Sequence, residues 1–377
     1  MGFEKLKVAL VHDWLVSQRG GEHVLLEIAN FFPNAPIFTL VHQPGSVAPQ
    51  LESHPIYTSF IQNLPGAPQR FRPYLGLFPK AIEAFDLSAY DLIVSTSHCV
   101  AKGVKVRQGQ KHLSYIHTPM RYIWDQMPHY LPSCPGKEFL DEVAHLLTTP
   151  LRSWDVRSAQ RPSQLIANSE FVAQRIRKYW QRDADVIHPP VDTTYYAGDS
   201  GKKERSGFLV VSALVAYKSV ALAVDWATTY GEHLRVFGQG PELERLKARA
   251  GPHVDFVQGA SKEDLAEAYQ SAEALLFCGV EDFGIVPVEA MASGCPVVAF
   301  NRGGCRETVV GDGAGCTGVF FDRPHIESLQ GALVELRRRR LQTGVLAPEG
   351  LKDHAERFSR RVFVERMQEA LQRVVAS

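Results

Sequence analysis

Residues 281–298 read Glu-Asp-Phe-Gly-Ile-Val-Pro-Val-Glu-Ala-Met-Ala-Ser-Gly-Cys-Pro-Val-Val. Phe283-Gly284 marks a turn, and Pro287 suits the first turn of a helix, where the N–H that proline lacks would have no helical partner. Gly294 fits the left-handed position just past a helix end. The apolar run Pro296–Phe300 is typical of a buried strand. The stretch therefore predicts a turn, a short helix and a strand in succession.

Two glutamates, Glu281 and Glu289, stand eight positions apart around the start of this predicted helix. The apolar run Ala274–Cys278 precedes them, so the turn follows a strand and opens a helix. A helix N-terminus attracts anions through its free N–H groups and its dipole. A carboxylate beside a phosphate is unfavourable unless it accepts hydrogen bonds from sugar hydroxyls, so the two features together indicate a sugar nucleotide. The alternative is two surface glutamates on an ordinary helix.

With its Phe-Gly turn, proline and Gly-x-Pro-Val-Val context, the glutamate pair resembles the E-x7-E signature of the retaining glycosyltransferases of family GT4. The resemblance implies an α/β protein of the GT-B fold, in which two Rossmann-like, doubly wound domains enclose the active site in the cleft between them. It implies that Glu289 holds the ribose hydroxyls and that Glu281 is a catalytic residue holding the donor sugar. The adjoining residues implied in donor binding are Asp282, Phe283, Gly284 and Ile285.

Composition narrows the class of protein. The chain has 377 residues, 45% of them hydrophobic, which suits two or three globular domains. Lys plus Arg and Asp plus Glu both number 41, which argues against a nucleic-acid partner. The six cysteines form no CxxC pair, so we expect buried free thiols in a reducing cytoplasm. We find neither a membrane-spanning apolar run nor a signal-peptide pattern, and these features predict a cytoplasmic protein.

Strand-like apolar runs alternate with helical patterns, which predicts parallel sheets covered on both faces. The predicted strands of a first set are Leu6–Val11, Ile37–Val41, Leu92–Ser95, Leu113–His117, Leu165–Asn168 and Val186–His188. Those of a second set are Phe208–Ser212, Leu234–Phe237, Val254–Val257, Ala274–Cys278 and Val297–Phe300.

These two sets define the expected domains. An acceptor-side Rossmann-like domain occupies residues 1–192, and a polar linker occupies residues 193–206. A nucleotide-sugar domain occupies residues 207–358. The C-terminal helix, within residues 359–377, is expected to cross back to the first domain, as the resemblance to GT-B enzymes implies.

Glycine-rich turns follow strands in both halves. Gly20-Gly21 opens a helix after the first strand, where glycine lets the backbone approach a phosphate closely. Gly238 and Gly240 lie in a similar turn, and Val257 ends the next predicted strand. The resemblance implies donor binding by all of these residues, with Val257 gripping the base through its backbone. The alternative is that the glycine turns are purely structural.

The segment Tyr115–Asp125 ends a strand and enters a polar, aromatic loop, and ligands of open α/β sheets bind at such strand ends. The segment is similar to the H-T-P-x-R-Y-x-W pattern of a GT4 subgroup that includes GDP-mannose-dependent mannosyltransferases. The resemblance implies that His117 is a catalytic residue that orients the donor sugar, the alternative being a hydrogen-bonded core histidine. His98, at another strand end, is a second candidate or serves only to satisfy loop backbone. Residues implied on the acceptor side are Thr118, Arg121 and Trp124.

Lys218 closes the segment Val211–Lys218, at the end of the first strand of the second set. A lysine there can meet a diphosphate as a point charge, and the alternative is a surface lysine. The segment resembles the R-L-x-x-x-K element of GT4 enzymes, which implies that Lys218 is a catalytic residue at the donor diphosphate. Ala213 stands where many members have arginine, which puts the donor affinity in question.

The sequence therefore predicts a retaining hexosyltransferase that uses a nucleotide diphosphate sugar as co-substrate. The resemblance implies no metal or cofactor, GDP-mannose as donor with a UDP-sugar as the alternative, and a lipid-linked saccharide as acceptor. A polyprenyl-diphosphate-linked saccharide of bacterial polysaccharide or O-antigen assembly is the expected acceptor. A GT-B sugar-nucleotide epimerase and a catalytically weak protein that binds a nucleotide sugar or a partner enzyme remain alternatives.

The segment Gln69–Lys80 mixes cations with aromatic and aliphatic residues. Such a segment can dock at an anionic membrane surface, which would place the protein peripherally on the inner face of the cytoplasmic membrane. The alternative is an ordinary helix packed on the core by Phe71, Leu75 and Phe78.

Overall fold

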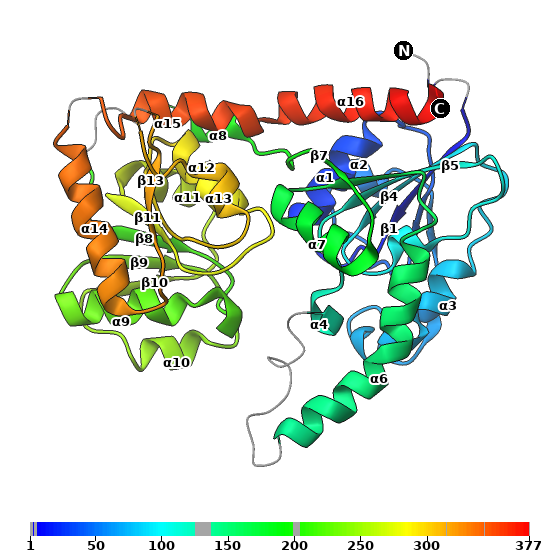
Figure 1. Cartoon of the computed structure of the whole chain (residues 1–377), viewed down its shortest axis with the longest axis horizontal. Coiled ribbons are helices and arrows are strands. Elements are labelled where there is room, and N and C mark those ends of the chain that lie inside the picture. The colour runs from blue at the N-terminus through cyan, green and yellow to red at the C-terminus, as the bar shows by residue number, and fades with distance from the viewer. Residues whose placement is uncertain are drawn as a thin grey trace. The chain divides into compact units, whose positions relative to one another are not determined.

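Two parallel β-sheets, each flanked by helices, organise the chain into two units (Figure 1). The computed structural model describes residues 3, 6–124, 137–198, 204–313, 315–342 and 344–376. The first unit comprises Met1–Pro190 and Phe363–Ser377, and the second comprises Val191–Val362.

The sheet of the first unit has the strand order β3-β2-β1-β4-β5-β6-β7, and its neighbouring strands pair in parallel. Its strands are β1 (Val8–His12), β2 (Ile37–Thr39), β3 (Ile56–Thr58), β4 (Leu92–Ser97), β5 (Lys111–Ile116), β6 (Gln164–Ala167) and β7 (Asp185–Val186). Its α-helices are α1 (Gly20–Ala29), α2 (Pro49–Glu52), α3 (Phe78–Glu83), α4 (Arg121–Trp124), α6 (Lys137–Ser158) and α7 (Glu170–Trp180). Three 3-10 helices accompany them: η1 (Phe60–Asn63), η2 (Arg72–Leu77) and η3 (Ala101–Gly103).

The sheet of the second unit has the order β10-β9-β8-β11-β12-β13, again with parallel pairing. Its strands are β8 (Phe208–Val211), β9 (Leu234–Phe237), β10 (Val254–Val257), β11 (Ala274–Phe277), β12 (Val297–Phe300) and β13 (Gly318–Phe321). Its α-helices are α8 (Thr193–Tyr196), α9 (Val220–Tyr230), α10 (Leu243–Lys247), α11 (Lys262–Ser271), α12 (Ile285–Ala292), α13 (Cys305–Thr308), α14 (Ile326–Arg340) and α15 (Pro348–Ala355). The 3-10 helices are η4 (Ala216–Lys218) and η5 (Glu356–Phe358).

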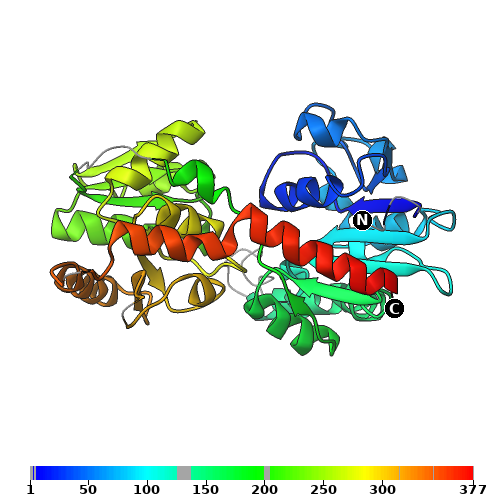
Figure 2. The ribbon, with the colours of Figure 1, turned by 90° about the horizontal axis from the view of Figure 1, so that it is seen from above.

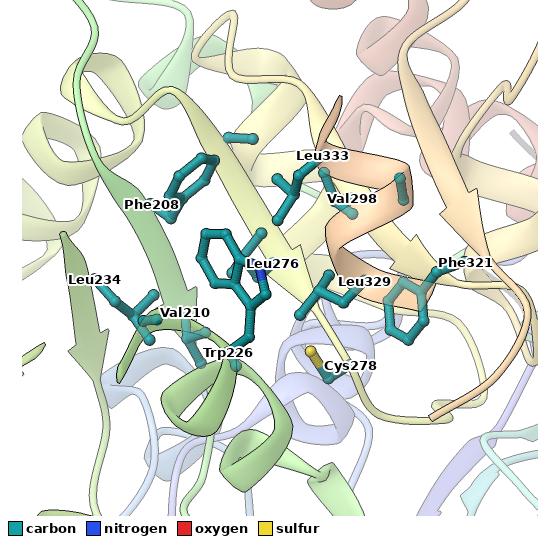
Figure 3. Close-up of a cluster of buried hydrophobic side chains, with 14 of the residues drawn as sticks. Phe208, Val210, Trp226, Leu234, Leu276, Cys278, Val298, Phe321, Leu329 and Leu333 are labelled. Carbon is teal, nitrogen blue, oxygen red and sulfur yellow. The ribbon is translucent and has the colours of Figure 1, made fainter. Parts of the chain in front are cut away.

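Most strands bury residues on both faces of their sheet, since successive strand residues point to opposite faces. In β8, Phe208 and Val210 join the cluster drawn in Figure 3, where Trp226 of α9 and Leu329 of α14 meet them. Leu209, between them, belongs to a separate cluster on the other face. The near-continuous apolar runs of the sequence therefore reflect strands that are covered on both sides.

The strand order of each sheet reverses at one point, between β1 and β4 in the first unit and between β8 and β11 in the second. In open α/β sheets, ligands bind outside the carboxyl ends of the strands at such a reversal. These two places are therefore where the fold itself positions a site.

The final helix, α16 (Arg360–Ala376), is drawn in red in Figures 1 and 2. It begins in the second unit and continues into the first, where Phe363, Met367 and Leu371 are buried in one cluster with residues of β1. The polar segment expected as a linker, residues 193–206, contains α8, whose Thr193 and Tyr196 are buried in the second unit. The change of unit falls earlier, after Pro190.

Some of the sequence expectations concern residues that the structure does not describe. Residues 199–203 of the expected linker, Asp125 and Cys134 lie outside the described residues. The other five cysteines are free and buried. In the described ranges, no helix combines the length and the apolar character that crossing a bilayer demands.

Candidate active site

Lys218 and Glu281 meet at the strand-order reversal of the second sheet. Lys218 ends η4 in the connection after β8, and Glu281 lies in the turn between β11 and α12. The ammonium Nζ of Lys218 forms an ion pair with Oε1 of Glu281, and their side chains are only 13% and 27% exposed. A cation and a carboxylate at this point match the chemistry of a sugar diphosphate, whose phosphates need the one and whose hydroxyls need the other.

Three glycines hold this ion pair in place by close backbone packing. A Cβ on Gly279 would lie 2.9 Å from the carbonyl oxygen of Lys218. A Cβ on Gly303 would lie 2.5 Å from the carbonyl oxygen of Glu281, and the backbone N–H of Gly304 donates a hydrogen bond of 2.8 Å to that same oxygen. The Gly303-Gly304 turn after β12 therefore buttresses the backbone that carries Glu281.

Glu289 has different partners from Glu281. It lies on α12, where the buried Tyr269 of α11 donates a 2.9 Å hydrogen bond from its hydroxyl to Oε2, and Tyr196 of α8 contributes another. Burial raises the pKa of Glu289, and the hydrogen bonds from the two tyrosines offset part of that rise. The glutamate expected at the ribose is thus anchored by two tyrosines that its sequence context did not reveal.

The start of α12 provides the remaining donor-side residues. Gly284 precedes the helix with a φ of 91°, a left-handed conformation that favours glycine, and Ile285 is the first helical residue. Phe283 is buried, whereas Asp282 is partly exposed in the same turn. These residues directly follow Glu281 in the chain, so they lie beside the Lys218–Glu281 ion pair.

Gly238 and Gly240 follow β9, and each packs against the connection after β8. A Cβ on Gly238 would lie 3.1 Å from the carbonyl carbon of Ser212, and one on Gly240 would lie 2.7 Å from that of Leu214. The N–H of Gly238 donates to the carbonyl of Val257 at the end of β10. Both glycines thus have a packing role, and they shape the loop that leads to Lys218.

In the first unit, His117 ends up beside the glycine turn of α1. A Cβ on Gly21 would lie 3.5 Å from Nε2 of His117 and 3.7 Å from Cε1 of His12. That Nε2 is buried and has no hydrogen-bond partner among the described residues. Burial, together with the neighbouring His98 and His12, lowers the pKa of His117 to about 3, so the imidazole is neutral at pH 7. Gly20, the first residue of α1, opens the helix next to this histidine.

Two polar side chains that the sequence expectations omitted, those of His12 and Glu22, lie near His117. His12 ends β1 and hydrogen-bonds through Nδ1 to Thr96 of β4 at 2.6 Å. Glu22 of α1 lies 3.6 Å from Nε2 of His12. Burial by itself raises the pKa of Glu22, but the interaction with His12 outweighs it, and the pKa falls to about 2. The available signal was the sequence His12-Asp13, two polar residues directly after a buried strand.

The expected acceptor-side residues all follow β5 but have different surroundings. Thr118 accepts a 2.6 Å hydrogen bond on its hydroxyl from Arg175 of α7. Arg121 opens α4 and is partly exposed. Trp124 donates from Nε1 to the buried Asp155 at 2.8 Å, and Tyr179 stacks on its ring at 4.6 Å. One face of the indole is thus already covered within the protein.

The structure therefore gathers the predicted residues into two groups. In the second unit, Lys218 and Glu281 are in direct contact, while Glu289 is held separately by its tyrosines. In the first unit, His117 and Gly21 are neighbours. In the described part of the chain, no group of three or more His, Cys, Asp or Glu side chains is arranged to hold a metal ion.

Comparison with known protein families matches both units. Residues 18–195 match the family model described as "Glycosyltransferase Family 4", and residues 197–341 match that described as "Glycosyl transferases group 1". Among curated proteins, the human alpha-1,3/1,6-mannosyltransferase ALG2 is 24% identical over 239 residues, which cover 54% of this chain and 56% of that protein.

A GDP-mannose-dependent alpha-(1-6)-phosphatidylinositol monomannoside mannosyltransferase of Mycobacterium tuberculosis is 29% identical over 180 residues, covering 40% of this chain and 46% of that protein. The matched stretches thus span about half the length of these curated relatives.

Solved structures resemble this one over nearly its whole length. Anabaena HepE in complex with UDP has a TM-score of 0.69 at 17% identity, covering 97% of this chain and 100% of that one. Sucrose-phosphate synthase from Thermosynechococcus elongatus has a TM-score of 0.70 at 14% identity, covering 98% and 99%. At such low identities the likeness concerns the fold.

Proposed function

This chain belongs to glycosyltransferase family 4 and has the GT-B fold, and from that premise we propose that it transfers a hexose from a nucleotide diphosphate sugar to an acceptor hydroxyl. The observation that carries the proposal is the Lys218–Glu281 ion pair at the strand-order reversal of the second sheet. Lys218 supplies a cation for the leaving diphosphate, and Glu281 supplies hydrogen-bond acceptors for hydroxyls of the donor sugar.

In the proposed reaction, the bond between the anomeric carbon and the diphosphate oxygen breaks, and a bond to the acceptor oxygen forms on the same face. The proton of the acceptor hydroxyl passes to the leaving phosphate. Negative charge develops on the diphosphate as the bond breaks, and a fixed cation in a partly buried site stabilises such charge more than water does. Glu289 holds the ribose, and His117 orients the donor sugar.

The test is a screen of labelled nucleotide sugars for release or transfer of the sugar. A transferase releases the nucleoside diphosphate when it moves the sugar to an acceptor. Without an acceptor, it hydrolyses its donor slowly. A GT-B epimerase would instead convert one nucleotide sugar into another, and a weak relative would bind without turnover. Ala213, which is exposed and carries no charge in the loop before Lys218, is the observation that favours the weak relative.

The proposed donor is GDP-mannose. The support is the segment from His117 to Trp124, together with the relatives that are named as mannosyltransferases. We expect GDP to raise the melting temperature and UDP to raise it less. A ligand that binds only the native state stabilises it by about 2.7 kcal/mol at a hundred times its Kd. Thermal unfolding with each nucleotide measures this, and a shift with UDP but none with GDP would assign a uridine donor instead.

The proposed acceptor is a polyprenyl-diphosphate-linked saccharide at the inner face of the cytoplasmic membrane. The support is the segment Gln69–Lys80 on η2 and α3. Its Phe71 and Phe78 are buried and pack on Trp14, as the core-packing alternative expects, while Leu75 is half-buried. Its cations Arg70, Arg72 and Lys80 are exposed, and Leu77 is 42% exposed between them. The segment thus combines a packed side with a cationic outer side.

We expect the protein to float with anionic liposomes and not with neutral ones. Each Lys or Arg near an anionic surface contributes about 1 kcal/mol, so Arg70/Arg72/Lys80→Glu should abolish flotation. The charge-matched control is Arg245/Lys247/Arg338→Glu, three exposed cations of the second unit. Equal loss of flotation in both variants would show that net charge, not this segment, drives binding.

A further inference from the structure

A second histidine, His98, lies at the strand-order reversal of the first sheet. It follows β4, and Asp13 follows β1, so the two residues face each other across the place where the strand order turns back. Its ring centroid is 6.3 Å from that of His117 and 6.1 Å from that of His12. The fold places His98 where an open α/β sheet binds its ligand.

Asp13 fixes the loop that carries His98. Its carboxylate is fully buried and accepts hydrogen bonds from four consecutive backbone N–H groups, of residues 98 to 101, at 2.6 to 2.9 Å. Burial by itself raises the pKa of Asp13, but its electrostatic interactions with His98 and His12 and the hydrogen bonds from these N–H groups outweigh burial, and the pKa falls. The loop backbone is thus satisfied by Asp13, so the imidazole of His98 is not needed for that purpose.

Asp13 also orients the His98 ring. Nδ1 of His98 lies 3.2 Å from Oδ2 of Asp13, which favours the tautomer with its proton on Nδ1. Trp14 packs edge-on against the same ring at 4.3 Å and limits its rotation. Nε2 is then left with a lone pair, and the side chain is 25% exposed. Burial lowers the pKa of His98, and Asp13 offsets only part of that effect, so the ring stays neutral at pH 7.

The three histidines differ in what they can still bind. Both ring nitrogens of His12 face groups of the protein, namely Thr96 and Glu22. Nε2 of His117 is buried against Gly21. The His98 ring is instead held by Asp13 and Trp14, its Nδ1 faces Asp13, and its side chain is partly exposed to solvent. An Nε2 lone pair in such a ring accepts a hydrogen bond from a hydroxyl group.

We infer that Nε2 of His98 accepts a hydrogen bond from the acceptor hydroxyl and so positions it for transfer. The ligand chemistry is a sugar hydroxyl of the acceptor, and Asp13 is a positioning residue that acts through His98. This inference rests on the proposed glycosyl transfer.

The test compares His98→Ala and His98→Gln with the wild type in two assays. One measures transfer from GDP-mannose to a panel of alkyl hexosides and polyprenyl-diphosphate-linked hexoses, and the other measures hydrolysis of GDP-mannose without acceptor. Loss of one hydrogen bond in His98→Ala should lower kcat/KM for the best acceptor about tenfold. Donor hydrolysis and the affinity for GDP should stay at wild-type values. His98→Gln should recover most of the transfer, because its amide oxygen can accept the same hydrogen bond.

The matched control is His54→Ala, which removes a buried histidine at the opposite, amino edge of the same sheet, where Nδ1 lies 2.8 Å from the carbonyl of Ala35. Melting temperatures identify any variant that fails to fold. If the wild type transfers the sugar and His98→Ala retains wild-type acceptor kinetics, the inference is wrong and the proposed function stands. If the wild type transfers to no acceptor, the proposed function fails, and the inference falls with it.

Discussion

Replacement of Lys218 by alanine is expected to weaken the binding of a nucleoside diphosphate such as GDP by about a hundredfold, the equivalent of about 3 kcal/mol. Two effects add. The diphosphate loses a charge-assisted hydrogen bond, and the Glu281 carboxylate, which Lys218 neutralises in this structure, then faces the phosphates without a cation. Ala213 supplies no replacement charge in the same loop.

Calorimetric titration with GDP measures the affinity of each variant. Lys247→Ala, which removes an exposed lysine of α10 that pairs with Glu244, is the control and should bind like the wild type. An unchanged affinity in Lys218→Ala would place the diphosphate elsewhere.

The reciprocal substitution, Glu281→Gln, should act in the opposite direction on binding. It removes a negative charge near the phosphates and releases Lys218 from its ion pair, so the affinity for free GDP should stay the same or rise. Turnover should nevertheless fall about ten- to a hundredfold, because the donor sugar loses hydrogen bonds to a charged group. Glu289→Gln should mainly weaken nucleotide binding. Wild-type turnover in both glutamine variants would contradict the site assignment.

The apolar runs of the sequence predicted most of the fold because most strands are covered on both faces. Eleven predicted runs correspond to strands of the structure. Among the described residues, two strands were missed. β3 is an edge strand of three residues, and Tyr57 within it is exposed, so it has no continuous apolar pattern. β13 begins at Gly318, behind a glycine-rich segment, so its apolar run is only Val319–Phe321.

The contacts of the site were less predictable because they join distant parts of the chain. The sequence proposed Lys218 and Glu281 separately, but the parallel pairing of β8 with β11 is what brings them into contact. Asp13 and His98 are 85 positions apart and meet only because β1 pairs with β4. Trp124 was expected on the acceptor side, and its indole N–H donates to Asp155 of α6, a helix that no motif linked to it. Motifs therefore identified the chemistry, and topology determined the partners.

A substitution in the Gly303-Gly304 turn should also have a large effect. The turn packs against the backbone that carries Glu281, and it need not contact the substrate itself. In Gly304→Ala, the added Cβ would lie 2.7 Å from the carbonyl carbon of Asp282 and closer still to Cα of Phe283. Its φ of −66° suits alanine, so the whole effect is steric. The colliding atoms are backbone and cannot rotate away, so the turn that carries Glu281 must shift.

We expect Gly304→Ala to lower the free energy of unfolding by about 3 kcal/mol, the upper end of the cost of overpacking. In a unit of this size that corresponds to a melting temperature lower by about 6–12 °C. Turnover should fall about a hundredfold even at temperatures where the variant is folded, because a shift of about 1 Å in a substrate-positioning group has that effect.

Gly331→Ala is the control, since it adds the same methyl group to an exposed site on α14 where no atom beyond the adjoining backbone of the helix lies within 4 Å. There alanine should stabilise the helix by about 0.5–1 kcal/mol and leave turnover unchanged. Differential scanning calorimetry and donor hydrolysis measure the two quantities for each variant. A Gly304→Ala protein with the stability and turnover of the wild type would show that the Glu281 turn does not depend on this buttress.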